Sequence, residues 1–303
     1  MNYINDLREL IGNTPILKLQ SFGTKEGVNI FAKLENFNPG GSVKDRIGVA
    51  MLEDAEKKGL LKPGFTIVEA TAGNTGIGIV FAALKKGYRV IFTVPEKFSI
   101  EKQIIMRALG AEIINTPLEL GMEGAIKKAN ELLETIENSI SLAQFKNPVN
   151  PAIHYSTTGR EIYEQLDGDI DYFVAGAGSG GTFTGIARYL KEKKPSVKAI
   201  IADPIGSTIG GGEAGCYKIE GIGNDFIPDT LDIELADDFI KVNDDEALAY
   251  VKELARYEGL LVGSSSGAAL AAAIKLANSI DKGNIVIVFP DRGDRYFSKN
   301  LYE

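Results

Sequence analysis

The sequence predicts an α/β fold built on parallel sheets, and three observations lead to that prediction. Short runs of β-forming residues alternate with helical stretches along nearly all of the 303 residues. Several of these runs are apolar throughout, which is typical of strands buried on both faces of a sheet. Glycine or proline stands near many of the helix ends. Strands separated by helices pair in parallel through right-handed crossovers, so parallel sheets are expected.

The predicted elements follow one another in a regular order. Seven strands are expected where β-forming residues dominate: Asn29–Leu34, Thr66–Ala70, Arg89–Val94, Glu112–Asn115, Tyr172–Ala175, Lys198–Ala202 and Asn284–Phe289. Seven helices are expected, most of them between those strands: Val43–Lys58, Gly76–Lys85, Ile100–Leu109, Gly124–Glu137, Thr182–Lys193, Asp244–Glu258 and Ser266–Ser279. The chain is longer than one typical domain, so we expect its core to be divided in two.

Composition excludes several classes of protein. The net charge is −8, and the 33 basic residues are interspersed with 41 acidic ones, which argues against a nucleic-acid partner. No apolar run approaches the ~20 residues of a membrane-spanning helix, so no membrane span is expected. The amino terminus lacks a basic stretch followed by an apolar one, so a cytoplasmic location is expected.

Cysteine and histidine are too scarce for several kinds of chemistry. The single cysteine, Cys216, excludes an internal disulfide and a multi-thiolate zinc site, and no metal is expected. The single histidine, His154, makes a Ser-His-Asp hydrolase hard to build, and we interpret both residues as structural. Lysine, hydroxyl groups, amides or a cofactor must therefore carry the chemistry.

Four polar loops fall where predicted strands run into helices, which is where parallel sheets bind ligands. They are NPGGSVKDR (38–46), TAGNTG (71–76), GAGSGGTFTG (176–185) and GSSSGAA (263–269). In the third loop, the glycines at 176, 178 and 181, with Asp203 ending the next strand, have the spacing of a dinucleotide fingerprint. A nicotinamide-dependent dehydrogenase is therefore the rival hypothesis. The hydroxyls of Ser179 and Thr182 favour a terminal phosphate instead, and a glycine turn without a ligand is the plainest alternative.

Lys44 falls in the first turn of a predicted helix. We expect Ser42 as its N-cap, with Asp45 completing a capping box. The helix dipole disfavours a protonated amine there by ~0.3–1 kcal/mol, whereas a neutral imine escapes that cost. Lys44 is therefore a candidate Schiff-base lysine, and a solvated surface lysine is the alternative.

The two remaining loops are rich in hydrogen-bond donors. Thr71, Asn74 and Thr75 open a helix with hydroxyls, an amide and free N–H groups, a combination that suits a carboxylate. Ser265 and its two serine neighbours precede an alanine-rich helix, where an N-cap cluster is an equally good interpretation.

Together these motifs resemble the cysteine synthase and cystathionine β-synthase family of fold-type II pyridoxal-phosphate enzymes. IGNTPILKL, NPGGSVKDRIG, TAGNTG, VPEKFSIEKQ, GSGGT, EGIGNDFIP and GSSSGAA stand in the family's order and approximate spacing from about residue 4 to the end. The resemblance implies two parallel-sheet α/β domains of the tryptophan-synthase-β-like type, with the cofactor in the cleft between them. It places residues 45–147 in a smaller mobile domain and residues 1–44 plus 148–303 in a larger one, and it implies a homodimer.

The resemblance also implies a role for each site residue. Lys44 would bind pyridoxal 5′-phosphate as an internal aldimine, Asn74 would bond the ring's phenolic oxygen, and Ser265 would meet the pyridine nitrogen. The cofactor phosphate would lie on Gly178, Ser179, Gly180, Gly181 and Thr182. The substrate carboxylate would lie on Thr71, Ala72, Asn74, Thr75 and Gln144, and its amino side near Gly221, Ile222 and Gly223. Two stretches depart from the family pattern: Ala72 replaces a common serine, and ADPIGSTIGGG (202–212) is atypical.

The reaction implied is β-elimination and β-replacement on a three-carbon amino acid, L-cysteine or O-acetylserine, through an aminoacrylate. Asp225, Asp229 and Asp232 lie in and just after the EGIGNDFIP motif. Acidic groups attract the ammonium of an amino-acid thiol but repel hydrosulfide. We expect Asp232 to make that contact and a thioether, lanthionine or cystathionine, to form. For the reaction, the alternative is a cysteine synthase that uses sulfide. For the acidic residues, the alternative is a solvated loop without a role in binding. A non-catalytic binding module is the hypothesis from another class.

Overall fold

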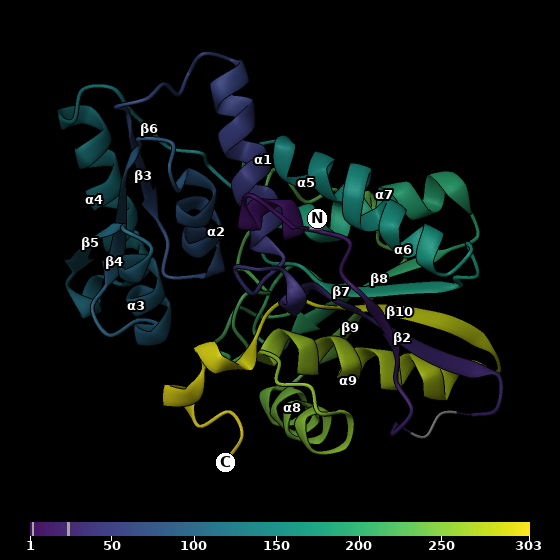
Figure 1. Cartoon of the computed structure of the whole chain (residues 1–303). Helices are drawn as coiled ribbons and strands as arrows, with labels where there is room; N and C mark the ends of the chain where they lie inside the picture. Colours follow the sequence, from purple (N-terminus) through teal and green to yellow (C-terminus); the bar gives the residue numbers. More distant parts are fainter. Residues whose placement is uncertain (2, 23–24) are drawn as a thin grey trace.

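The computed structural model describes residues 1, 3–22 and 25–303, and two sheets organise it (Figure 1). The larger sheet has the strand order β1-β2-β10-β7-β8-β9. Its strands are β1 (Ile16–Lys18), β2 (Val28–Leu34), β10 (Gly283–Phe289), β7 (Tyr172–Gly176), β8 (Lys198–Pro204) and β9 (Asp238–Val242). Every neighbouring pair is parallel except β1 with β2, which is antiparallel.

The smaller sheet is parallel throughout, with the order β5-β4-β3-β6. Its strands are β5 (Glu112–Thr116), β4 (Arg89–Pro95), β3 (Thr66–Ala70) and β6 (Ser139–Ile140). Figure 1 shows α2 (Asn74–Ala83), α3 (Ile100–Ala108) and α4 (Gly121–Thr135) around it. The predicted limits 45–147 enclose all four strands, and the domain division itself stays a prediction.

Helices cover both faces of the larger sheet (Figure 1). One side carries α5 (Val149–His154), α6 (Arg160–Gln165) and α7 (Gly181–Lys193), and the other carries α8 (Asp244–Glu258) and α9 (Ser264–Ser279). The side chains of β10 alternate between the two cores: Ile285, Ile287 and Phe289 pack with α9, whereas Val286 and Val288 pack with α7. This alternation explains why the strand is apolar along its whole length.

Two helices approach each other closely enough to bring their backbones into contact. A Cβ atom built at Gly78 of α2 would lie 2.3 Å from the backbone oxygen of Lys44, the first residue of α1 (Lys44–Lys57). A Cβ atom at Gly48 of α1 would meet the backbone of Gly78 at the same distance. Glycine at both positions therefore lets α1 and α2 pack side by side, which sets the first turns of both helices together.

A buried ionic cluster, made of Lys33, Glu35, Arg46 and Glu161, fastens α1 to the larger unit. Arg46 donates to both carboxylates, to Glu35 at 2.8 Å through Nε and Nη2 and to Glu161 at 2.7 Å through Nη1 and Nη2. Lys33 Nζ lies 2.7 Å from Glu161 Oε2. At most 9% of each residue is exposed, so the charges compensate one another away from water.

The predicted fold class is confirmed, and all seven predicted strands and seven predicted helices are present with ends shifted by up to three residues. The sequence patterns missed β1, β6, β9, α5 and α6, which have two to six residues each. Such short segments give too few positions for a hydrophobic period to appear. Among the described residues, no helix is long and apolar enough to cross a membrane.

Candidate active site

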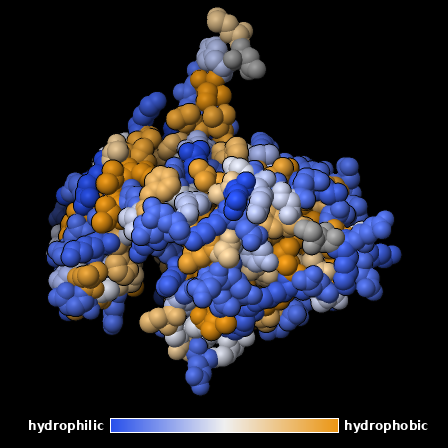
Figure 2. All heavy atoms as spheres, turned by 90° about the horizontal axis from the view of Figure 1, so that it is seen from below, coloured by the Kyte–Doolittle hydropathy of each residue, from blue (hydrophilic) through white to orange (hydrophobic). Residues whose placement is uncertain are grey.

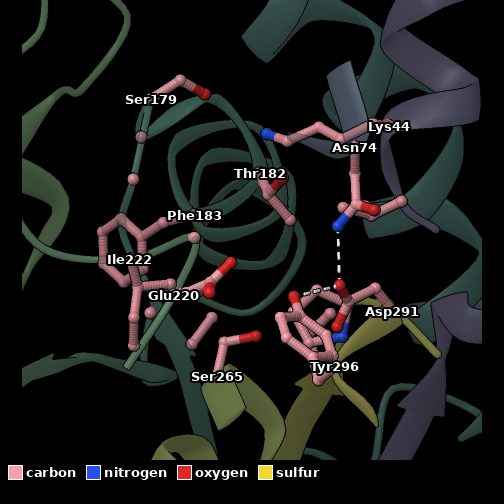
Figure 3. Close-up of a pocket in the computed structure, with 18 residues that line it drawn as sticks. Lys44, Asn74, Ser179, Thr182, Phe183, Glu220, Ile222, Ser265, Asp291 and Tyr296 are labelled. Atoms are coloured by element: carbon pink, nitrogen blue, oxygen red, sulfur yellow. Dashed lines mark hydrogen bonds between the residues drawn. The ribbon is translucent and has the colours of Figure 1, made fainter. Parts of the chain in front are cut away.

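A pocket lies where the carboxyl ends of β7 and β10 meet the first turns of α1, α2, α7 and α9 (Figure 3). Its lining combines one lysine, two acids, glycines and hydroxyl groups. The lining residues are Val43, Lys44, Asn74, Ala175, Gly176, Gly178, Ser179, Gly180, Thr182, Phe183, Glu220, Gly221, Ile222, Ser265, Val288, Pro290, Asp291 and Tyr296. The structure thus brings together residues from all four predicted loops and adds the Glu220–Ile222 turn.

Lys44 is the first residue of α1, which agrees with its predicted place in the first turn, but the predicted capping box is wrong. Val43 occupies the N-cap position, and the Asp45 carboxylate accepts from the Gly40 N–H at 2.6 Å rather than from Ser42. Ser42 pairs instead with Asp291 in an isolated β-bridge, and its hydroxyl accepts from the Lys44 N–H at 3.2 Å. The strand-like contact of this loop with residues 290–292 therefore replaces the local cap.

Burial lowers the pKa of Lys44 to about 8, against an opposing effect of the nearby Asp291 charge. An ordinary lysine keeps almost no neutral amine near pH 7, whereas a pKa of about 8 leaves roughly a tenth of it neutral. The amine points into the cavity (Figure 3). Lys44 can therefore act both as a nucleophile toward a carbonyl group and as an acceptor of a proton.

Residues 178–182, here called the phosphate loop, form a cradle at the first turn of α7. Gly180 is left-handed, with φ of +83°, and no side chain caps the helix, so its first N–H groups stay available to an anion. A Cβ atom at Gly178 would lie 2.3 Å from the Gly221 backbone oxygen, and one at Gly181 would lie 2.0 Å from Asn150 Oδ1. The cradle is closed by close backbone contacts, and the hydroxyls of Ser179 and Thr182 line it.

Asn74 is held in a fixed orientation by two charged neighbours. Its Nδ2 donates to Asp291 Oδ2 at 2.6 Å, and its Oδ1 accepts from Arg295 Nη1 at 2.5 Å. Tyr296 donates to the same Asp291 oxygen at 2.6 Å (Figure 3). In the part of the chain that the structure describes, the second N–H of the Asn74 amide has no hydrogen-bond partner, so it can bind a ligand in the pocket.

Ser265 lies across the cavity from Lys44 at the start of α9, with 5% of the residue exposed (Figure 3). Its hydroxyl makes no hydrogen bond to another residue in the described ranges. The neighbouring Ser264 hydroxyl accepts from the Glu220 N–H at 2.9 Å and so has a structural use. Only one serine of the predicted cluster therefore offers an uncommitted hydroxyl to the pocket.

Of the residues predicted to bind the substrate carboxylate, Asn74 lines the pocket, whereas the other four are not among its lining residues. Thr75 Oγ1 donates to Gln144 Oε1 at 2.6 Å, and the Thr71 hydroxyl accepts from the Gly73 N–H at 3.2 Å. Gly73 is the N-cap of α2, and no side chain caps that helix. Thr71, Ala72 and Thr75 thus surround an open helix N-terminus to which Gln144 is joined.

Gly221 and Ile222 line the pocket, and Gly223 follows them outside it. The sequence patterns missed the residue just before this turn, Glu220, whose carboxylate points into the cavity (Figure 3). It is bound to Lys102 of α3 at 2.9 Å, and 31% of its side chain is exposed. Asp291 was missed as well, although it follows the carboxyl end of an apolar parallel strand and could have been found by that rule.

The structure does not bring Asp232 to the pocket, which corrects the prediction that it contacts the incoming thiol. Asp232 lies beside α7 and is bound to Arg188 at 2.9 Å, with both side chains at least 36% exposed. Its backbone N–H donates to the Thr184 hydroxyl, which turns the segment toward the outer side of the helix. Of Glu220 and Asp232, the two acids near this motif, only Glu220 lines the cavity.

The dehydrogenase alternative fails at its acidic residue. Asp203 is 1% exposed, is bound to Lys241 at 2.6 Å, and accepts from the Gly210 N–H at 2.9 Å. A carboxylate engaged in this way cannot bind the two hydroxyls of a ribose. A lysine with a lowered pKa beside an anion cradle is instead the arrangement that a pyridoxal-phosphate enzyme needs.

The family model described as "Pyridoxal-phosphate dependent enzyme" matches residues 7–291. The chain belongs to this family. An O-acetylserine dependent cystathionine beta-synthase from Bacillus subtilis is 57% identical over 304 residues, covering 100% of this chain and 99% of that protein. A cysteine synthase from Helicobacter pylori is 49% identical over 308 residues, covering 100% of both chains. The crystal structure of a hydrogen sulfide-producing enzyme from Fusobacterium nucleatum superposes with a TM-score of 0.93 at 41% identity, covering 97% of this chain and 100% of that one.

These comparisons and the pocket agree on the cofactor. The enzyme depends on pyridoxal phosphate and falls within the cysteine synthase and cystathionine β-synthase group of its family. The uncapped first turn of α7, the free Asn74 N–H and the uncommitted Ser265 hydroxyl fit a phosphate, a phenolic oxygen and a ring nitrogen, respectively.

Proposed function

We propose that the enzyme replaces the β-substituent of a three-carbon amino acid, O-acetylserine or L-cysteine, with an amino-acid thiol. The products would be cystathionine or lanthionine, with acetate or hydrogen sulfide released. The observation that carries the proposal is Lys44, a lysine with a pKa lowered to about 8 that lines the same pocket as the proposed phosphate loop. The relatives named above support the reaction class.

When bound, pyridoxal phosphate supplies an electron sink that stabilises negative charge at the substrate α-carbon. In our proposal the phosphate loop holds the phosphate, Asn74 binds the phenolic oxygen, and Ser265 meets the ring nitrogen. Ser265 is neutral, so it does not keep that nitrogen protonated, which favours prompt loss of the β-substituent over racemisation. Lys44, with its lowered pKa, would accept the substrate α-proton at its Nζ.

The substrate carboxylate binds, in our proposal, at the open first turn of α2, where Thr71, Thr75 and Gln144 supply polar groups. Ala72 contributes a backbone N–H only. Because this turn belongs to the smaller sheet and Lys44 stands beside the larger one, closure of one unit on the other would shield the reacting atoms from water.

Glu220 is our candidate for the choice of thiol. A carboxylate at the cavity repels hydrosulfide and attracts the ammonium of cysteine or homocysteine, which competes with Lys102 for it. A sulfide-using cysteine synthase is the second candidate, favoured by the 49% identical relative. The test compares kcat/KM for homocysteine, cysteine and sulfide, each with O-acetylserine, in wild type and in the Glu220→Gln and Asp232→Asn variants.

We expect Glu220→Gln to lower the ratio of kcat/KM for amino-acid thiols to that for sulfide by about tenfold, since a charge pair in a partly buried site is lost. Lys44→Ala should abolish turnover, with cofactor still bound at the phosphate loop. A change of the ratio in Asp232→Asn alone, or a wild type that strongly prefers sulfide, would overturn the assignment. Incubating the enzyme with L-cysteine alone and measuring the mass of the product tests directly for lanthionine.

We further propose that the enzyme is a cytoplasmic homodimer. Tyr3, Ile4, Leu7 and Leu10 are 42–69% exposed in the amino-terminal segment, which stands out from the body of the molecule with apolar residues on it (Figure 2). A second copy of the chain would cover them. Light scattering should give twice the mass of the chain, and Leu7→Glu should lower it, whereas a monomeric wild type would contradict the proposal.

A further inference from the structure

Two fully buried side chains outside the pocket, Asn150 and His154, face the hydroxyl groups of the phosphate loop. Both belong to α5, and their spacing of four residues puts them on one face of the helix. Asn150 Nδ2 lies 3.0 Å from Ser179 Oγ, and His154 Nε2 lies 3.2 Å from Thr182 Oγ1. Ser179 and Thr182 in turn point into the cavity beside Lys44 (Figure 3).

The direction of the Asn150 hydrogen bond follows from its second partner. The same Nδ2 lies 2.9 Å from the backbone oxygen of Gln144, which can only accept. The amide nitrogen must therefore face Gln144 and Ser179, and it donates to both. A hydroxyl has a single hydrogen, so Ser179, as the acceptor from Asn150, keeps its own hydrogen for another partner.

The direction of the His154 hydrogen bond follows from its charge and its other nitrogen. Burial, with Arg46 adding to it, lowers the pKa of His154 to about 3, so the ring is neutral near pH 7 and carries one N–H. Nδ1 lies 2.9 Å from the Thr158 hydroxyl, which has no other acceptor among the described residues. Thr158 therefore donates to Nδ1, and Nε2–H donates to Thr182.

We propose that Asn150 and His154 are positioning residues that turn the hydroxyl hydrogens of Ser179 and Thr182 toward the cofactor phosphate. A phosphate only accepts hydrogen bonds, so a hydroxyl helps to bind it only when the hydrogen faces it. Because Asn150 and His154 donate to these hydroxyls, the hydroxyl hydrogens cannot point toward α5, even in the enzyme without cofactor. The proposal rests on the phosphate loop proposed above and not on which thiol is used.

The test uses the apoenzyme, from which the cofactor has been removed. It measures the Kd of two probes for that apoenzyme: pyridoxal phosphate, and pyridoxal, which lacks the phosphate. Asn150→Asp keeps the shape of the side chain but makes it an acceptor, so Ser179 must turn its hydrogen away from the phosphate. We expect the Kd for pyridoxal phosphate to rise about tenfold or more, the size of one lost hydrogen bond to a charged group, and the Kd for pyridoxal to stay within about twofold. Asn150→Ala removes the donor without putting an acceptor in its place, so the Kd for pyridoxal phosphate should rise by a smaller factor. This variant tests the proposal even if Asn150→Asp does not fold.

His154→Gln is the matched variant for the second hydroxyl, because its amide can donate where Nε2–H does, whereas His154→Met cannot. The Kd ratio of the two probes should be nearly unchanged in His154→Gln and altered in His154→Met. Adding Asn150→Asp to Ser179→Ala should give no further loss. Equal losses for both probes, or an added loss in the Ser179→Ala background, would overturn the positioning role. If Ser179→Ala itself left the probe ratio unchanged, the phosphate loop assignment would be the part that fails.

Discussion

Replacing Arg46 with methionine tests whether the buried ionic cluster holds α1, and Lys44 with it, in place. Arg46 makes four hydrogen bonds of 2.7–2.8 Å to Glu35 and Glu161, all away from water. Without it, Glu35 keeps only neutral partners and Glu161 keeps only Lys33. Breaking a buried pair in this way costs about 3–5 kcal/mol, against a total stability of about 5–15 kcal/mol.

The expected shift of the melting temperature follows from the size of the chain. An unfolding entropy of about 2.1 cal/mol/K per residue gives about 0.64 kcal/mol/K for the whole chain, so 3–5 kcal/mol lowers Tm by about 5–8 °C. Calorimetry of wild type, Arg46→Met and Arg89→Met measures it. Arg89 is the matched control: it binds Glu112 through two hydrogen bonds of 2.8 and 2.7 Å, but both side chains are 51% exposed, so solvent screens the pair and Tm should hardly move.

The pH dependence gives the Arg46 prediction a second measurement. Burial alone would raise the pKa of Glu161, but Arg46 and Lys33 lower it to about 2, below the ordinary 4.5. A carboxyl with a lowered folded-state pKa adds stability above pH 4.5 that is lost as pH falls toward 2. The difference in stability between wild type and Arg46→Met should therefore become smaller below pH 4.5. An equal decrease of Tm in Arg46→Met and Arg89→Met would refute the reasoning. So would a stability difference between wild type and Arg46→Met that does not depend on pH.

Two further predictions concern the pocket. Asp291→Asn removes the negative charge that raises the pKa of Lys44, so that pKa should fall below about 8. The pH midpoint for binding of pyridoxal phosphate to the apoenzyme should therefore decrease. An unchanged or higher midpoint would contradict the prediction. Gly178→Ala places a methyl group 2.3 Å from the Gly221 backbone oxygen, so the cradle must open and the Kd for pyridoxal phosphate should rise at least tenfold. Gly215→Ala, whose Cβ atom would meet its nearest neighbour at 3.6 Å, is the control and should leave that Kd unchanged.

Local patterns were sufficient to predict the alternation of strands and helices and the loops that carry the pocket. Lys44, Asn74, Ser265 and most of the phosphate loop lie at one pocket, as expected for polar loops that open helices at one edge of a parallel sheet. The role of each residue stays a prediction. Gly181 is the member of the loop that does not reach the surface of the pocket, since it packs on Asn150.

The errors share a physical cause, which is that side-chain direction and pairing depend on residues distant in the sequence. Asp232 and Glu220 are both acids near the same motif, yet contacts with α7 turn one outward, and a bond to Lys102 of α3 holds the other at the cavity. Ser42 would cap α1 if the helix stood alone, but pairing with residue 291 takes its place.

Composition, hydrophobic period and loop motifs are local properties of the chain, so they already indicate which residues have chemistry to offer. Which of those residues act together depends on how the molecule packs. No sequence motif distinguishes Asn150, and the sequence predicts only a structural role for His154. The packing of α5 against α7 places both side chains behind Ser179 and Thr182. Hydrogen-bond direction and burial are properties of the packed molecule, since they depend on every neighbour a group meets, and no local pattern encodes them.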